Sequence, residues 1–206
     1  MLDKYIVPAI KPALRKIAER LHERGWSADS MTVVGFVLGL FTVPFIAFEL
    51  TGVALLLLVL NRLADGLDGE LARLKAPTDA GGFLDITLDF FFYALFPIGF
   101  ALADPATNAL PAAVLILSFV GTGASFLAFA AQAQKQSIVS PNFAYKSLYY
   151  LNGLAEGTET ILCFVLMCLF PDSFAVIAYC FAIVCLITAA NRTVFGYRTL
   201  KQSNLD

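Results

Sequence analysis

Long apolar segments separated by short polar connections dominate the chain. Three of them, residues 31–48, 109–131 and 174–191, contain no charged side chain over 18 residues or more, which is typical of transmembrane helices. Three others are apolar over only part of their length: residues 52–74, 82–103 and 153–170. We expect these to cross the membrane as well, with their polar halves facing a hydrated, protein-lined cavity. The pattern therefore predicts an all-α integral membrane protein with six transmembrane helices.

An amphipathic segment precedes the first of these spans. Its apolar side chains recur close to helical period: Ile6, Ile10, Leu14, Ile17 and Leu21. Basic residues lie between them, so residues 2–26 are expected to form a helix on the membrane surface, facing anionic head groups. Pro8 and Pro12 place the start of regular helix near residue 12, where Pro12 would suit the first turn. The alternative is a helix packed on a further soluble domain, but the sequence offers no such domain.

The composition agrees with this interpretation. The chain has 206 residues, 59% of them hydrophobic, and a mean hydropathy of +0.76. We expect one membrane domain over residues 1–206, with the helix bundle at about 31–200. Four cysteines lie in apolar segments near the C-terminus and lack the spacing of a zinc site, so packing explains them better than a disulfide framework does.

The distribution of positive charge predicts the orientation. Of the 14 Lys and Arg residues, six precede residue 31, three lie in 52–75, two in 132–152 and three after residue 191. The alternate connections, near residues 51, 104–107 and 171–173, have none. By the positive-inside rule, both termini and the polar half of 52–74 face the cytoplasm of an inner (cytoplasmic) membrane. The net charge is −2, and no nucleic-acid partner is expected.

The stretch from 65 to 89 carries the candidate chemistry. On a helix, one face would contain Asp65, Asp68, Gly69, Ala72 and Arg73, and a second helical face would contain Gly81, Asp85 and Asp89. If the two faces meet, four carboxylates surround one small space, and such oxygen donors suit Mg²⁺ or Mn²⁺. The small side chains would let a ligand approach closely, and the arginine can fork onto a phosphate. Helix capping would explain single acids, but not their shared phase on both segments.

These residues also resemble a family signature. The pattern D-x-x-D-G-x-x-A-R…G-x-x-x-D-x-x-x-D is similar to that of the CDP-alcohol phosphotransferases, membrane enzymes of phospholipid synthesis. The family usually has about eight residues between its Arg and the second Gly, whereas residues 74–80 are seven. Choosing Gly82 instead of Gly81 would restore the spacer but break the G-x-x-x-D step.

The resemblance implies a role for each matching position. Asp65, Asp68 and Asp85 are implied metal ligands for what we expect to be two ions, and Asp89 is the implied general base, with a metal contact as well. The residues implied to bind the cytidine diphosphate are Gly69, Ala72, Arg73 and Gly81. Thr32 is added because it matches the threonine in the polar segment that the family often has before its first span.

The implied activity is transfer of a phosphatidyl-type group from a CDP-linked lipid, CDP-diacylglycerol, to a small alcohol, releasing CMP. A homodimer is implied as well. The acceptor residues are open: a phosphate could be held by Lys135, Lys146, Arg192 and Arg198, which also suit membrane anchoring. Glu156 and Glu159 would bind a polyol or a cationic acceptor, or else cap a helix. The stretch from residue 146 is similar to a little-characterised bacterial branch of the family.

Two other classes of protein remain as alternatives. An intramembrane prenyltransferase also binds a diphosphate through Mg²⁺ and spaced aspartates, but Arg73 behind Gly69 and Ala72 favours the CDP interpretation. A cation transporter would line an ion path with carboxylates through the depth of the membrane. Here the acids gather at one end of their segments.

Overall fold

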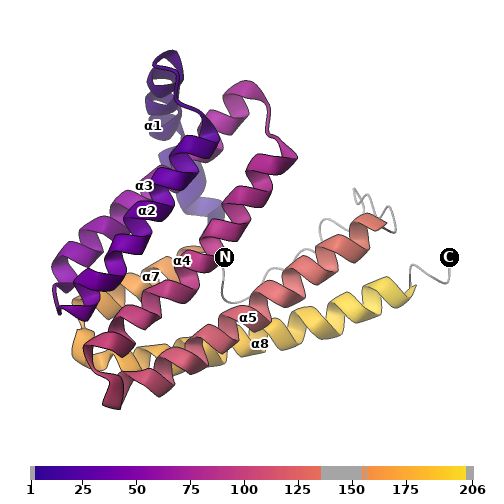
Figure 1. Cartoon of the computed structure of the whole chain (residues 1–206). Coiled ribbons are helices and arrows are strands. Elements are labelled where there is room, and N and C mark those ends of the chain that lie inside the picture. Colours follow the sequence, from indigo (N-terminus) through magenta and orange to yellow (C-terminus); the bar gives the residue numbers. More distant parts are fainter. Residues whose placement is uncertain (1–2, 136–154, 156, 203–206) are drawn as a thin grey trace.

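The structure is a computed structural model that describes residues 3–135, 155 and 157–202. Within these residues the chain is helical, with short connections, and a single 3-10 turn, η1 (Pro171–Ser173), precedes the last helix. The α-helices, drawn in Figure 1, are α1 (Asp3–Glu23), α2 (Ala28–Ala47), α3 (Thr51–Lys75), α4 (Asp79–Ala103), α5 (Pro105–Lys135), α7 (Gly157–Leu169) and α8 (Phe174–Gln202).

Four of the described helical segments are long and apolar enough to cross a membrane: α2, α4, α5 and the segment Pro171–Gln202 that contains α8. Helix α3 has 25 residues, but its second half contains the charged motif. Helix α7 is apolar but has only 13 described residues. The structure thus confirms an all-α membrane protein, and the described parts of the expected apolar segments lie almost entirely in helices.

Two helix boundaries differ from the prediction. Regular helix was expected to begin near residue 12, but α1 begins at Asp3, so this prediction was wrong. Pro12 lies on the exposed side of α1, where the carbonyl that it leaves without an amide partner can be hydrated. Helix α8 continues to Gln202, eleven residues past the apolar segment, and still packs on α5 there: a Cβ added at Gly196 would lie 3.0 Å from Phe129 Cδ2.

The helices form two groups that share α4. Helix α2 packs on both α3 and α4, while α5 packs on α4 and, along its length, on α8. Figure 1 shows α5 and α8 side by side, leading away from the α2–α3–α4 group. Helix α1 packs on α3. Small residues permit the close contacts: a Cβ added at Gly35 of α2 would lie 3.1 Å from the Cβ of Ala64 in α3.

An aromatic core joins α4, α7 and α8 and reaches from the ring of Phe92 to the end of the bundle remote from the motif. The rings of Phe96 and Phe164 stack with centroids 4.1 Å apart, and those of Phe100 and Phe174 stack at 4.4 Å. All four side chains are buried. The four cysteines are free thiols, three of them buried near this core, in agreement with the packing role expected for them.

Candidate active site

Three helices position the polar residues of the motif. Helix α4 starts where the Thr78 hydroxyl accepts a hydrogen bond from the Gly81 amide at 3.0 Å, so the motif glycine belongs to its first turn. Helix α3 is fixed to α2 by Asn61, whose side-chain amide donates to the Gly35 carbonyl at 2.8 Å in a buried position. The two helical faces predicted from the sequence are therefore held at the same end of the bundle.

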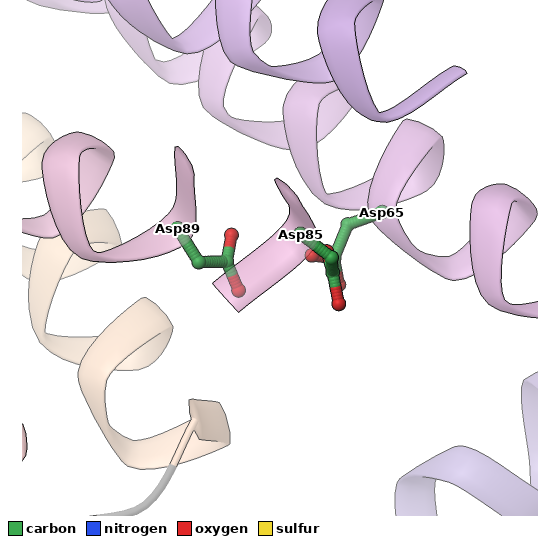
Figure 2. A group of neighbouring side chains, drawn as sticks. All are labelled: Asp65, Asp85 and Asp89. Atoms are coloured by element: carbon green, nitrogen blue, oxygen red, sulfur yellow. The ribbon is translucent and has the colours of Figure 1, made fainter. Parts of the chain in front are cut away.

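Three of the four aspartates form one cluster. Asp65 of α3 and Asp85 and Asp89 of α4 each offer a carboxylate oxygen, and these oxygens all lie within 4.8 Å of one another. The side chains are half-buried, and Figure 2 shows them turned toward the same space. Hard divalent cations prefer such a set of carboxylate oxygens, so the donor chemistry fits Mg²⁺ or Mn²⁺. This cluster could hold a metal ion.

Arg62 is the positive charge beside this cluster. Its Nη2 lies 3.1 Å from Asp89 Oδ1, and its Nη1 lies 3.4 Å from Asp65 Oδ1. Its guanidinium also lies over the rings of Phe92 and Tyr93, at 5.0 and 5.7 Å from their centroids. These contacts orient the Asp89 carboxylate and partly neutralise the cluster.

Asp68 occupies a neighbouring position instead of the centre of the cluster. It is buried, and its Oδ2 accepts a hydrogen bond from the Thr32 hydroxyl of α2 at 2.8 Å. Asp68 lines the same small cavity as Asp65, Asp85 and Asp89, so all four predicted carboxylates meet there. The hydrogen bond from Thr32 holds the Asp68 carboxylate beside the close triad of the other three.

A larger pocket of about 370 Å³ adjoins the carboxylates. Its wall includes every residue that the family resemblance assigned to the nucleotide: Thr32, Gly69, Ala72, Arg73 and Gly81. Asp68, Asp85 and Thr32 line both this pocket and the small carboxylate cavity, so the two spaces share part of their wall. The volume is in the range of pockets that bind small molecules.

The glycines of this pocket have different surroundings. At Gly69 an added Cβ would meet only the guanidinium of Arg73, at 3.6 Å and beyond, and would otherwise project into the pocket. At Gly81 an added Cβ would lie 3.0 Å from both Asp29 Oδ1 and Thr78 Oγ1, which leaves it little room. Gly69 therefore leaves space for a ligand, and Gly81 permits the tight start of α4.

The described residues among those suggested for the acceptor lie away from the two pockets. Lys135 is exposed at the end of α5, and Glu159 is half-buried in the first turn of α7. Arg192 of α8 donates to the Thr122 carbonyl of α5 at 3.3 Å and lies over the Phe126 ring. None of these three lines the two pockets described above. Glu156 and Lys146 lie outside the described residues.

Sequence reasoning missed several residues of this site. Arg62 was counted only as a basic residue of the cytoplasmic side, although it stands three residues before Asp65 and thus on the same helical face. Glu70 was passed over, although it is buried beside Arg73. His22 and Trp26, which line the larger pocket from α1 and the α1–α2 connection, gave no signal beyond being single residues of their type.

The fold and this site define a class: an all-α membrane protein with a carboxylate cluster and an adjoining ligand pocket at one end of its bundle. The chain belongs to the CDP-alcohol phosphatidyltransferase family, whose family model matches residues 26–190. The assignment confirms the family resemblance and decides against the prenyltransferase and the cation transporter.

Three known proteins resemble this chain, two of them over most of its length. It is 54% identical to the inner membrane protein YnjF of Escherichia coli K12 over 201 residues, or 98% of each chain. It is 33% identical to the archaetidylinositol phosphate synthase of Pyrococcus horikoshii over 90 residues, which cover 43% of this chain and 47% of that one. The crystal structure of the phosphatidylinositol phosphate synthase PgsA1 of Mycobacterium tuberculosis, with CDP-DAG bound, has the same fold. The TM-score is 0.66 at 16% identity, over 89% of this chain and 93% of that chain.

Proposed function

We propose that this protein transfers a phosphatidyl-type group from a CDP-linked lipid, CDP-diacylglycerol, to a small alcohol and releases CMP. The observation that carries the proposal is that the pocket lined by Gly69, Ala72 and Arg73 shares Asp68 and Asp85 with the cavity of the aspartates. A diphosphate that enters this pocket reaches the carboxylates. The family assignment and the CDP-DAG bound to PgsA1 support this choice of donor.

Asp65, Asp68, Asp85 and Asp89 are the proposed metal-binding residues, for two Mg²⁺ or Mn²⁺ ions. When bound, divalent cations supply neutralisation of the diphosphate and of the negative charge that develops during phosphoryl transfer. The residues of the cluster supply oxygen donors from two helices, α3 and α4, that are both packed on α2. Arg62 compensates part of their mutual repulsion, since it contacts both Asp65 and Asp89.

The other residues of the pocket bind and orient the nucleotide. Gly69 and Ala72 let the cytidine diphosphate approach helix α3, and Arg73 donates to a phosphate oxygen. Gly81 and Thr32 complete the wall from α4 and α2. The acyl chains of the donor remain in the hydrocarbon region, so the reacting phosphorus lies where the membrane meets the pocket.

In the reaction, the acceptor oxygen forms a bond to the phosphorus that bears the lipid, and the bond from that phosphorus to the CMP oxygen breaks. The acceptor hydroxyl gives up its proton to Asp89, and CMP leaves with the electron pair of the broken bond. Arg62 holds the Asp89 carboxylate at 3.1 Å and so presents its second oxygen to the acceptor. No redox step or further reactant is needed.

We further propose six spans, one domain over residues 1–206 and α1 as an interfacial helix, in the inner membrane. Both termini and the motif would face the cytoplasm, since all 14 basic residues lie outside the alternate connections. The membrane location of YnjF supports the compartment. In a variant lacking the native cysteines, Ala106→Cys should react with an impermeant thiol reagent added outside intact cells, and Asp79→Cys should not. The opposite labelling would overturn the orientation.

The acceptor residues and the oligomeric state are proposed from the sequence and the family resemblance. Lys135, Arg192, Glu156 and Glu159 are kept as candidate acceptor residues, although the described ones lie outside both pockets. A homodimer is proposed from the family resemblance. Size-exclusion chromatography with light scattering in detergent tests it, and a monomer at working concentration would contradict it.

The decisive experiment for the activity is a turnover screen. Purified protein is incubated with CDP-diacylglycerol and Mg²⁺ or Mn²⁺, and CMP release is measured with glycerol phosphate, inositol, inositol phosphate, serine or choline. We expect CMP release that depends on both the metal and one class of acceptor. A sample without acceptor measures hydrolysis. If wild-type protein neither binds CMP nor releases it with any acceptor, the proposed activity is wrong.

A further inference from the structure

Glu70 is a buried acid that the proposed chemistry does not use. Its side chain is only 3% exposed, although it lies on α3 between the motif residues Gly69 and Ala72. A carboxylate buried without a positive partner is strongly destabilising, so its partners indicate its role. Two arginines, Arg73 and Arg15, approach it from different helices.

The first partner is Arg73 of the nucleotide pocket. Its Nη1 donates to Glu70 Oε1 one helical turn earlier, while the Arg73 side chain as a whole remains 53% exposed. Nη1 and Nη2 lie 3.6 and 3.9 Å from the position of a Cβ added at Gly69, so the guanidinium is folded back over the motif glycine. A guanidinium has five N–H donors, and one nitrogen bonded to Glu70 leaves others directed toward the pocket.

The second partner belongs to α1. Arg15 Nη1 lies 3.9 Å from Glu70 Oε2, and that oxygen is buried and accepts no hydrogen bond from the described residues. Helix α1 is seated on α3 here, because Leu14 packs against Gly66, where an added Cβ would lie 2.8 Å from Leu14 Cδ1. Ala18 is fully buried in the same contact. Arg15 therefore reaches Glu70 only while α1 is packed on α3.

We propose that Glu70 is a positioning residue that holds the Arg73 guanidinium toward the diphosphate. Through Arg15, Glu70 also links this position of Arg73 to the packing of α1 on α3. The inference deepens the proposed function and rests on the nucleotide role of Arg73. Without the carboxylate, the flexible arginine would sample other rotamers, and part of the binding free energy would be spent on ordering it. The position of Glu70 is one of the two unspecified positions between the Gly and the Ala-Arg pair of the motif, so the motif alone assigns it no role.

The test is a double-mutant cycle on CMP binding in the presence of Mg²⁺. Trp26, the chain's single tryptophan, lines the pocket, so its fluorescence reports binding beside calorimetry. Glu70→Gln keeps the shape and removes the charge, and we expect CMP affinity to fall about tenfold, the value of one charge-assisted hydrogen bond. In an Arg73→Ala background the same change should have no further effect, because the residue on which Glu70 acts is gone.

Two further variants separate positioning from support of the fold. Glu70→Asp retains the charge and should recover part of the lost affinity. Glu19→Gln is the matched control, since Glu19 is the exposed partner of Arg15 at 3.0 Å, and this change should leave CMP affinity unchanged. Thermal unfolding of each variant is measured in parallel. If Glu70→Gln does not fold, the cycle is measured with Glu70→Asp.

The outcomes separate this inference from the proposed function. Equal losses of affinity from the Glu70 change in the wild-type and Arg73→Ala backgrounds would show a merely structural role and overturn the inference. An unchanged affinity in Glu70→Gln, beside a loss in Arg73→Ala, would overturn the inference alone. A wild-type protein that does not bind CMP would overturn the proposed function and this inference with it.

Discussion

The two ends of the helix bundle both contain acidic residues, but these residues have different surroundings. At the motif end, Asp65, Asp85 and Asp89 lie within helices and converge to within 4.8 Å. At the other end, Glu49, Asp104 and Asp172 line a pocket of about 390 Å³. They do not form a comparable cluster: among the described residues, the triad is the one group of three such ligands that close together.

Asp104 shows what a capping carboxylate looks like in this protein. It precedes α5, and its Oδ1 accepts a hydrogen bond from the Thr107 amide at 3.3 Å. The hydrogen bonds from Thr107 hold the pKa of the exposed Asp104 carboxyl below its ordinary value. The aspartates of the triad lie inside α3 and α4, away from helix starts, so capping does not explain them. Both ends therefore contain acidic residues, but only at the motif end do three described carboxylates come close together.

The filling of space differs between the ends as well. Phenylalanine rings of α4, α7 and α8 close the bundle around Phe96 and Phe164. At the motif end, Gly69 and Ala72 leave a pocket open between α1, α2, α3 and the start of α4. Tight aromatic packing stabilises one end, and small and polar residues keep the other accessible to a ligand.

The largest effect that we expect comes from removing a carboxylate of the triad. Asp65→Asn or Asp85→Asn should reduce CMP release by about a thousandfold or more, because each removes a charged oxygen from the proposed metal site. Asp104→Asn is the matched control at the other end and should keep full turnover. The measurement is CMP release with CDP-diacylglycerol, with circular dichroism to check the helical content. Near-normal turnover of both triad variants would contradict the metal assignment.

Asp89→Asn should separate chemistry from binding within the same cluster. Loss of a general base lowers turnover by about a hundredfold or more, while CMP affinity should remain within a few fold of wild type, since the base acts on the acceptor. Turnover and CMP affinity are measured on the same preparations. An affinity loss as large as the loss of turnover would make Asp89 chiefly a metal ligand.

At the aromatic end we expect a substitution to lower the stability of the protein and to leave its turnover nearly unchanged. Phe174→Ala removes a fully buried ring stacked on Phe100, and such cavities cost about 3–5 kcal/mol in protein cores. The midpoint of thermal unfolding in detergent should fall by at least about 6 °C. Turnover per folded molecule, measured well below that midpoint, should change little. An unaltered midpoint would show that this end does not dominate stability.

The sequence was sufficient for the helical faces but not for all contacts between them. A period of 3.6 residues fixes that Asp65, Asp68 and Arg73 share a side of α3, and the structure keeps them there. The partner of Asp68 depends on how α2 packs, and this brings Thr32 to within 2.8 Å of it. The contact of Arg62 with Asp89 spans 27 residues and depends on how α3 and α4 both pack on α2.

The acceptor residues show a second limit. Lys135 and Arg192 were suggested because they are basic and near helix ends, features that membrane anchoring also produces. Arg192 is directed at the Thr122 carbonyl and the Phe126 ring of α5, contacts that no periodicity in the sequence indicates. The start of helix α1 was misjudged because proline position alone does not reveal which side of a helix is exposed.

Helix α3 has one glycine in the pocket, Gly69, and one near its other end, Gly52, so the effect of a larger side chain can be compared at the two positions. Gly69→Val should weaken CMP binding by about tenfold or more, because the branched side chain would occupy the pocket. Gly52→Val should leave binding unchanged, since an added Cβ at Gly52 meets nothing within 4 Å and lies at the opposite end of the helix. Fluorescence of Trp26 and calorimetry give both affinities. Normal CMP binding and turnover by Gly69→Val would show that this face of α3 is not the nucleotide site.

The smallest effect that we expect is that of Arg73→Lys. Lysine keeps the positive charge but loses the planar fork that bonds two acceptors at once, so CMP affinity should fall only about three- to fivefold, less than in Arg73→Ala. Because an ammonium on a flexible chain is held less firmly by Glu70, a subsequent Glu70→Gln change should cost less here than in the wild-type protein. The measurement is CMP affinity in the four proteins of this cycle. A loss in Arg73→Lys as large as that in Arg73→Ala would mean that geometry, and not charge, accounts for the whole contribution of this residue.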